Sequence, residues 1–276
     1  MNKVISKDGT EIAYDKTGNG PALILVDGAL MYRAFGSMPE LAKLLAPNFT
    51  VITFDRRGRG ESSNIQPYNL QNEIADLEAL IQEAGGSAFL FGISSGACLA
   101  LEASIQLGTK VKKLAMYEPP YNTENGSRQA WMDYRKQLEE ALAAGRKGDA
   151  VVLFMNLVGT PADQIEGMRN APMWPMFEAV APTLAYDAAA MGEDRSAPVK
   201  RAANVKSPTL VANGTVIPFM LDTAKVLAMA IPHARQLTLE GQSHNVDLKV
   251  LAPVLVDFFL QDGQSEKRVL EHSEER

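Results

Sequence analysis

The sequence has 276 residues, 46% of them hydrophobic, so it can bury a full core as one α/β domain with an insertion or as two small domains. Its formal net charge is −6, and no run of Lys or Arg is long enough to follow a phosphate backbone, which argues against nucleic acid as a partner. One cysteine, Cys98, excludes an internal disulfide, and neither a signal peptide nor a bilayer-spanning apolar run is visible. We therefore expect a soluble, cytoplasmic protein with no membrane partner, a monomer or a homodimer.

Strands and helices are predicted to alternate over residues 1–119. "KDGT" is a hairpin turn signal, so the segments on either side of it open the fold as two antiparallel strands. The hydrophobic patterns that follow predict strand 21–28, helix 38–47, strand 49–55, helix 70–86, strand 87–92, helix 94–107 and strand 111–119. This alternation is typical of a parallel sheet with helices on both faces.

The alternation is interrupted between residues 120 and 198, where helical segments occur without a convincing strand. It resumes with strand 207–214, helix 219–230, strand 234–241 and helix 248–260. We predict a core of residues 1–119 and 199–262, a helical cap or lid of 120–198, and a disordered charged tail of 263–276.

The predicted lid holds both tryptophans, Trp131 and Trp174, and six of the twelve methionines. Met and aromatic side chains form adaptable apolar surfaces, and most of these are expected to form the lid's own small core. "APMWPM" at 171–176 is different, because its two prolines disfavour a plain helix. We expect Trp174 to line an apolar substrate pocket.

A nucleophile pattern, "GISSG" at 92–96, stands between a predicted strand and a predicted helix. G-x-S-x-G in this context is typical of a nucleophile elbow, in which Ser94 occupies a sharp turn and Gly92 and Gly96 avoid clashes with the strand and the helix. The alternative is that Ser94 only caps the helix that follows it.

Three further segments share features with one fold family. "DRRGRGES" at 55–62 fits a D-x-R-G-x-G-x-S pattern, "VDGA" at 26–29 follows the third predicted strand, and "GQSHNVD" at 241–247 follows the last one. With "GISSG", they make the chain resemble the α/β-hydrolase fold with a cap domain over about residues 3–260. The resemblance implies a mostly parallel, doubly wound sheet of about eight strands.

The resemblance also implies a base and an acid in the order Ser, acid, His. Of the three histidines, His244 stands where the family places the base, while His233 is expected in a surface loop and His272 falls in the tail. The usual acid position, three residues after Gly214, is Ile217, which cannot accept a hydrogen bond.

Some members of the fold take the acid from the end of the preceding strand, and here that position is Glu118. Its longer side chain would help to span the extra distance. Glu118 could instead pair with an arginine or cap a turn at the start of the lid. Asp222 is a weaker candidate because it is expected to face solvent, and a Ser-His dyad without a carboxylate is a third possibility.

The oxyanion hole implied by the resemblance consists of the backbone N–H groups of Ser95 and of Ala29 or Leu30, and Leu30 is also expected at the substrate pocket. Asp27 stands where the family commonly has His. An ionised carboxylate about 5 Å from the oxyanion would oppose it by roughly 3 kcal/mol. Asp27 must therefore turn away, pair with Arg33 or Arg57, or be protonated.

Two interpretations of Asp27 remain. It could bond the N–H groups of its own loop, or, with a raised pKa, serve as a second acid or base.

The function indicated is a serine hydrolase that cleaves an ester, thioester or activated carbon–carbon bond in a small apolar substrate. Ser94 would attack, His244 would transfer the proton and Glu118 would orient His244. The alternatives are a lyase, cyclase or isomerase using His244 and Asp27, and a small-molecule binding protein without turnover. No metal-ligand spacing or dinucleotide-binding pattern is present, so no cofactor is expected.

Overall fold

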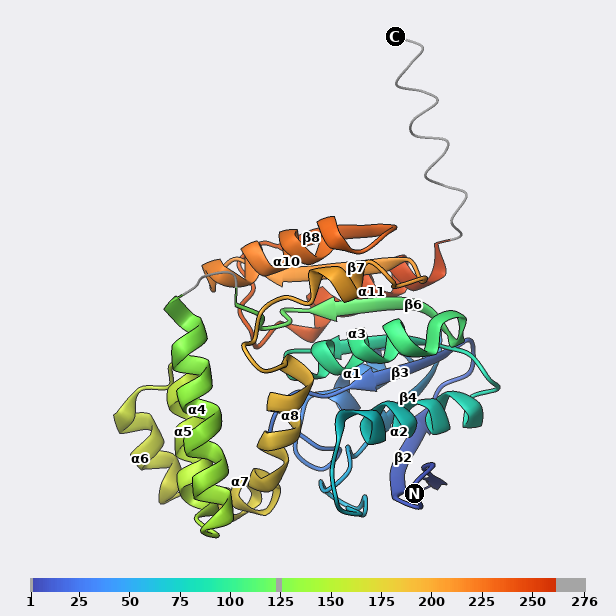
Figure 1. Ribbon diagram of the computed structural model, residues 1–276. Coiled ribbons are helices and arrows are strands. Elements are labelled where there is room, and N and C mark those ends of the chain that lie inside the picture. The colour runs from blue at the N-terminus through green and yellow to red at the C-terminus, as the bar shows by residue number, and fades with distance from the viewer. Residues whose placement is uncertain (1, 123–125, 262–276) are drawn as a thin grey trace.

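The computed structural model describes residues 2–122 and 126–261, and it is built on one central sheet (Figure 1). In spatial order the sheet contains β1 (Asn2–Ile5), β2 (Glu11–Thr17), β4 (Thr50–Phe54), β3 (Ala22–Val26), β5 (Ala88–Ile93), β6 (Val111–Tyr117), β7 (Thr209–Gly214) and β8 (Ala234–Leu239). β1 and β2 run antiparallel to their neighbours, and all other pairs are parallel. The predicted mostly parallel sheet of about eight strands is confirmed.

Helices cover both faces of the sheet, as a doubly wound fold requires. One face packs against α1 (Met38–Leu45) and α11 (Leu248–Leu260), and the other against α2 (Leu70–Glu83), α3 (Ser95–Leu107) and α10 (Pro218–Ala230). Two separate clusters of buried apolar side chains form these two interfaces. The central strands are buried on both sides, which explains their continuous apolar runs such as "ALILV" in β3.

Side-chain caps fix the start of two of these helices. The side-chain Oδ1 of Asn69 accepts from the N–H of Asn72 at the start of α2, over 3.1 Å. Asp247 accepts from the N–H of Lys249 at the start of α11, over 2.8 Å. Each bond satisfies an N–H that has no partner within the helix. The α11 cap begins three residues after His244, so it also defines the end of the loop that carries this histidine.

The segment between β6 and β7 is helical, as predicted. It contains α4 (Gly126–Ala143), α5 (Lys147–Leu157), α6 (Ala162–Arg169), α7 (Trp174–Val180), α8 (Leu184–Met191) and α9 (Val199–Ala202). In Figure 1, α4 to α7 stand beside the sheet, and α8 packs against α3. Its role as a lid, and the domain limits, stay predictions. The predicted disordered tail, 263–276, lies outside the described residues.

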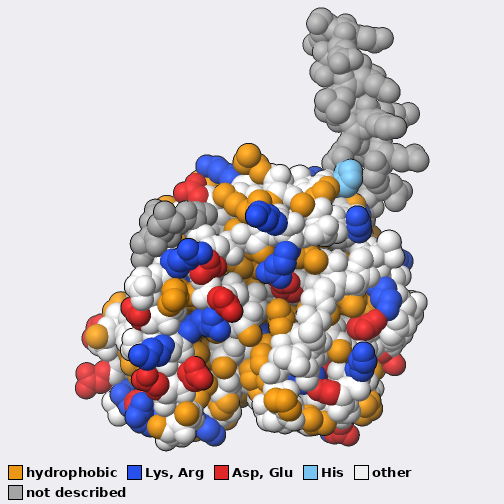
Figure 2. Space-filling view, viewed as in Figure 1, with side chains coloured by type: hydrophobic (Ala, Val, Ile, Leu, Met, Phe, Trp, Pro, Cys, Tyr) orange, Lys and Arg blue, Asp and Glu red, His pale blue; other side chains and the backbone are white. Residues whose placement is uncertain are grey.

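The surface in Figure 2 carries interspersed acidic and basic side chains rather than a continuous field of one sign. None of the helices within the described ranges is long and apolar enough to span a membrane. Cys98, on α3, is completely buried, as expected for a small apolar side chain at that position.

Candidate active site

Ser94 occupies a sharp turn between β5 and α3, with φ 56° and ψ −131°. A Cβ atom on Gly96 would lie 2.3 Å from the backbone oxygen of Val26, and one on Gly92 would lie 2.5 Å from that of Gly96. Only glycine fits either position, which explains the G-x-S-x-G pattern. Ser94 is the N-cap residue of α3 but makes no side-chain capping bond, so helix capping does not explain the serine at this turn.

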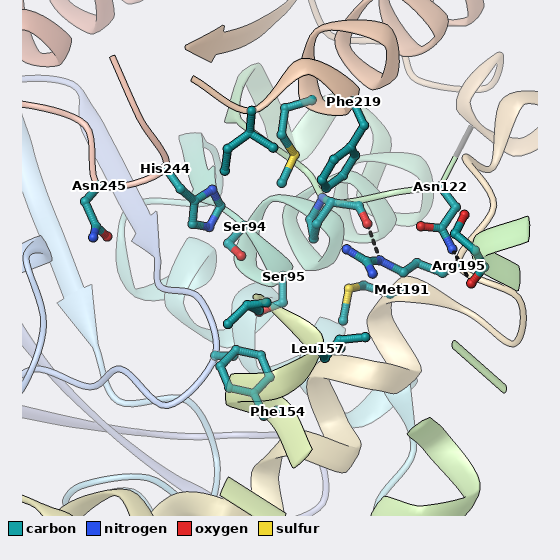
Figure 3. Close-up of a pocket in the computed structure, with 16 residues that line it drawn as sticks. Ser94, Ser95, Asn122, Phe154, Leu157, Met191, Arg195, Phe219, His244 and Asn245 are labelled. Carbon is teal, nitrogen blue, oxygen red and sulfur yellow. Dashed lines mark hydrogen bonds between the residues drawn. The ribbon is translucent and has the colours of Figure 1, made fainter. Parts of the chain in front are cut away.

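The Ser94 side chain faces a cavity of about 660 Å³, a volume typical of small-molecule sites (Figure 3). Polar side chains gather on its wall: Ser94, His244, Asn245, Asn122, Ser127 and Arg195. Apolar side chains form much of the remainder, among them Phe154, Leu157, Met191, Ile217, Phe219 and Met220. In Figure 3 the imidazole of His244 lies next to the side chain of Ser94.

Glu118 follows β6 directly and is completely buried. Its Oε2 lies 2.7 Å from Nδ1 of His244, and its Oε1 accepts the N–H of Gly214 over 2.9 Å. The backbone of Glu118 has φ 47°, a sparsely populated conformation for a residue other than glycine. The contact expected of a displaced acid is therefore present, and the alternative in which Glu118 pairs with an arginine is wrong. Its catalytic role stays a proposal.

The order of the strands explains how a residue of β6 can reach this histidine. β6 and β7 are parallel neighbours, so their carboxyl ends lie about one strand spacing, roughly 4.8 Å, apart. The Tyr117 hydroxyl donates to the carbonyl of Ser243 over 2.7 Å, which holds the loop that carries His244 close to the end of β6. Tyr117 and Glu118 thus contact the same loop from adjacent positions.

The other acid candidates lie elsewhere. Ile217, at the usual position, is the N-cap of α10 and forms part of the apolar wall of the cavity. The Asp222 side chain is 62% exposed and pairs with Lys225, as expected of a surface residue. His233 is exposed just before β8, as predicted, and His272 lies outside the described residues.

Ala29 and Ser95, the expected oxyanion donors, both line the cavity. No acceptor in the described part of the chain takes the N–H of either residue. Arg59 Nη1 donates to the carbonyl of Gly28 over 2.5 Å. Because the C=O and N–H of one peptide group point in opposite directions, this bond turns the Ala29 N–H away from the Arg59 guanidinium.

A buried charge cluster contacts the elbow at Ser95 and the loop that carries Ala29. Asp187 of α8 accepts from Arg56 and from the Ser95 hydroxyl through Oδ1, over 2.5 and 2.7 Å, and from Arg59 through Oδ2, over 2.7 Å. Arg56 is also bidentate to Glu73 of α2, over 2.8 and 2.9 Å. Burial acts to raise the pKa of Asp187, but the charges of Arg59 and Arg56 outweigh it and lower that pKa. The cluster joins α8, α2 and the elbow.

The predicted partners of Asp27 are wrong. Arg33 pairs with Asp15, Asp55 and Glu61, and Arg57 pairs with Asp8 and Asp76. The Asp27 side chain instead accepts the N–H of Gly28 over 2.9 Å, so it bonds its own loop. Burial raises the pKa of Asp27 to about 6. Asp27 is not part of the cavity wall, and it therefore lacks the contact with substrate that an acid or base needs.

Two residues expected at the substrate pocket lie outside the cavity wall. Trp174 starts α7, where Pro175 is tolerated in the first turn, and its indole N–H donates to Glu178 over 3.0 Å. The ring packs in the core of the helical segment and is 6% exposed. Leu30 is 2% exposed and also belongs to the core. Both expectations are therefore wrong.

The helical segment contributes other side chains that the sequence did not single out. Phe154 and Leu157 come from α5, Met191 ends α8, and Arg195 lies between α8 and α9. The neighbours of Arg195 in the sequence, Glu193 and Asp194, make it look like part of a solvated charged stretch. No pattern in the sequence distinguishes it from a surface arginine. Within residues 2–122 and 126–261, no group of three His, Cys, Asp or Glu side chains is placed to hold a metal ion.

Residues 22–250 match a family model described as the alpha/beta hydrolase family, which covers well over half of the chain. The chain belongs to the α/β-hydrolase family. An α/β hydrolase from Sphaerobacter thermophilus DSM 20745 is 48% identical, with a TM-score of 0.83 over 94% of this chain and 100% of that chain. This similarity to a solved family member covers both the sheet and the helical segment.

Other relatives are more distant. The uncharacterized hydrolase YraK of Bacillus subtilis (strain 168) is 30% identical over 122 residues, which are 43% of this chain and 44% of YraK, so the chain matches less than half of that protein. An esterase from Thermogutta terrifontis is 21% identical, with a TM-score of 0.68 over 94% of this chain and 97% of that one. That similarity shows the fold alone.

Proposed function

We propose that this family member is a serine hydrolase that cleaves an ester or thioester, or an activated carbon–carbon bond, in a small substrate. The observation that carries the proposal is the chain of contacts from Glu118 through His244 to the cavity that Ser94 faces. A serine hydroxyl becomes an effective nucleophile only when a base takes its proton, and a base works best when a third group fixes its tautomer. The similarity to hydrolases supports the same reaction class.

The first half of the reaction acylates the serine. Ser94 Oγ attacks the carbonyl carbon while Nε2 of His244 takes its proton. The carboxylate of Glu118 keeps the other imidazole proton on Nδ1 and stabilises the imidazolium. The N–H groups of Ser95 and Ala29 bind the oxyanion. His244 then gives its proton to the leaving alcohol or thiol, and an acyl-enzyme remains.

The second half restores the serine. A water molecule loses a proton to His244 and attacks the acyl carbon, and the proton then returns to Ser94 as the acid product leaves. The loop that carries the Ala29 amide is held by Arg59, and the elbow is held through the Ser95 hydroxyl by Asp187. These fixed donors avoid reorganisation during the reaction. The alternative acid–base chemistry is less well supported, because its second group, Asp27, is not part of the cavity wall and accepts the N–H of Gly28.

Turnover of simple esters tests the proposal. We expect wild type to hydrolyse short p-nitrophenyl esters or thioesters, and Ser94→Ala to lose at least about a thousandfold in kcat/KM. Ser37→Ala is a matched control, because Ser37 precedes α1 without a side-chain capping bond and is exposed. Equal ligand binding by wild type and Ser94→Ala, with no turnover by either, would establish a binding protein and contradict the proposal.

A further inference from the structure

Arg195 is held rigidly in the wall of the cavity. Its carbonyl accepts the N–H of Asn122 over 2.7 Å, and its Nε donates to the carbonyl of Pro120. The guanidinium carbon lies 5.3 Å from the centre of the Trp131 ring, a cation–π contact. The φ of 56° at Arg195 turns the chain at this point. Figure 3 shows the guanidinium reaching from the helical side into the space in front of Ser94.

The positive charge of Arg195 has no carboxylate partner in the described part of the chain. Every other arginine among the described residues forms an ion pair with an Asp or Glu side chain, except Arg135. Arg135 donates to the backbone carbonyl of Glu193. Even Asp194, the residue before Arg195, pairs with Arg128 instead. Among the described residues, only Nε of the Arg195 guanidinium donates a hydrogen bond to the protein, so its two terminal nitrogens remain for a ligand.

An unpaired cation in a largely apolar cavity is costly. Burial lowers the pKa of the Arg195 guanidinium for this reason, yet an arginine stays charged at neutral pH. A carboxylate on a ligand would supply the missing negative charge, and its geometry matches the fork of a guanidinium. Apart from His244, Arg195 is the one basic side chain that the described residues contribute to the wall, so a single negative charge is matched better than a phosphate dianion.

We propose that the substrate of the Ser94 site carries a carboxylate that binds Arg195, and that the enzyme hydrolyses monoesters or monothioesters of small dicarboxylic acids or related acid-bearing esters. This inference rests on the proposed function. The reacting carbonyl lies at Ser94, the anion at Arg195, and a short carbon chain between them packs against Met191 and Leu157. Asn122, beside Arg195 in Figure 3, gives that end of the cavity a second polar group.

The test uses matched pairs of methyl esters. The monomethyl esters of succinate, glutarate and adipate each have a neutral analogue in which a methyl ketone replaces the carboxylate. A pH-stat measures the acid released by wild type, Arg195→Met and Arg135→Gln. We expect wild type to prefer at least one acid ester over its analogue by tenfold or more. Arg195→Met should lose about a hundredfold in kcat/KM for that acid ester and less than threefold for the analogue.

The analogue shows that Arg195→Met is folded and active, and Arg135→Gln removes a positive charge from α4 without touching the cavity wall. Equal rates for both members of every pair, or an equal loss for both in Arg195→Met, would overturn the inference.

Calorimetric titration with glutarate separates the inference from the proposed function. Binding to wild type that is lost in Arg195→Met supports the anion site even if no ester is hydrolysed and only the hydrolase proposal fails. Binding that survives in Arg195→Met, or tighter binding of inorganic phosphate than of glutarate, overturns the carboxylate assignment.

Discussion

Replacement of Glu118 by Gln changes one atom of the proposed acid and nothing of its size. Glu118 Oε1 accepts the N–H of Gly214, and Oε2 lies 2.7 Å from Nδ1 of His244. In Glu118→Gln, the amide oxygen must stay on the Gly214 N–H, because an NH₂ group there would meet a second donor. The amide NH₂ therefore faces His244, which then accepts through Nδ1 and carries its proton on Nε2. In this tautomer, His244 cannot take the proton of Ser94.

The size of the effect follows from the cost of restoring the right tautomer. A flipped amide would lose the Gly214 bond and leave a buried donor unsatisfied, at about 1–3 kcal/mol. It would also lack the charge that stabilises the imidazolium. In a serine protease, the equivalent Asp-to-Asn change lowers kcat about 10⁴-fold. We expect Glu118→Gln to lower kcat/KM by about 10³ to 10⁴, or roughly 4–5 kcal/mol of transition-state stabilisation.

The assay is steady-state hydrolysis of an ester that wild type accepts, with circular dichroism and thermal unfolding to show that the variant is folded. Asp222→Asn is the matched control, since Asp222 is exposed and pairs only with Lys225, and its activity should equal that of wild type. A loss of less than tenfold in a folded Glu118→Gln would mean that Glu118 does not orient His244, and a large loss in Asp222→Asn would move the acid to α10.

Two further predictions concern buried carboxylates. The pKa of Asp27 is about 6, above its usual 3.8, so the native chain keeps a proton that the unfolded chain has released, and stability falls as pH rises through this window by about 3 kcal/mol in total. Asp27→Asn can still accept the Gly28 N–H. We therefore expect the free energy of unfolding of Asp27→Asn, relative to that of wild type, to be higher at about pH 8 than at about pH 5, as measured by urea unfolding. The variant should retain hydrolysis. Asp187→Asn leaves Arg56 and Arg59 without full compensation and should cost about 3 to 5 kcal/mol.

A difference in stability between Asp27→Asn and wild type that does not change with pH would mean that Asp27 is already ionised at about pH 5. Loss of hydrolysis in Asp27→Asn would favour the alternative in which Asp27 acts as an acid or base. Asp194→Asn, which breaks an ion pair with Arg128 closer to the surface, is the control for Asp187→Asn and should cost at most about 1 kcal/mol. Equal costs for the two would show that the buried cluster is not what joins α8 to the elbow.

Local patterns predicted the elbow and most of the strands. Gly92 and Gly96 are required by contacts within one strand–turn–helix unit, so the information lies in five consecutive residues. The resemblance to the α/β-hydrolase fold made Glu118 a candidate, because some members take the acid from the end of the preceding strand, and the pairing of β6 with β7 explains why that position is close enough. An ion pair with an arginine and a turn cap remained as alternatives for Glu118 until its distance to His244 was known, because a carboxylate in that position can bind several kinds of donor.

The features that the sequence did not predict depend on packing between distant segments. Arg56, Arg57 and Arg59 are all buried, and the carboxylate that each meets is decided by the positions of α2 and α8 rather than by sequence distance. For the same reason, Arg33 and Arg57 were wrong partners for Asp27. Arg195 reaches the cavity only because its backbone is held to Asn122, which lies more than seventy residues earlier.

Covalent labelling shows directly whether Ser94 is an activated nucleophile. Wild type, His244→Ala and Glu118→Gln are treated with a fluorophosphonate probe, and intact mass and peptide mapping give the stoichiometry and the site. We expect one probe per chain on Ser94, with labelling lost in His244→Ala and strongly slowed in Glu118→Gln. A wild-type protein that stays unlabelled while it hydrolyses an ester, or one labelled equally in His244→Ala, would contradict it.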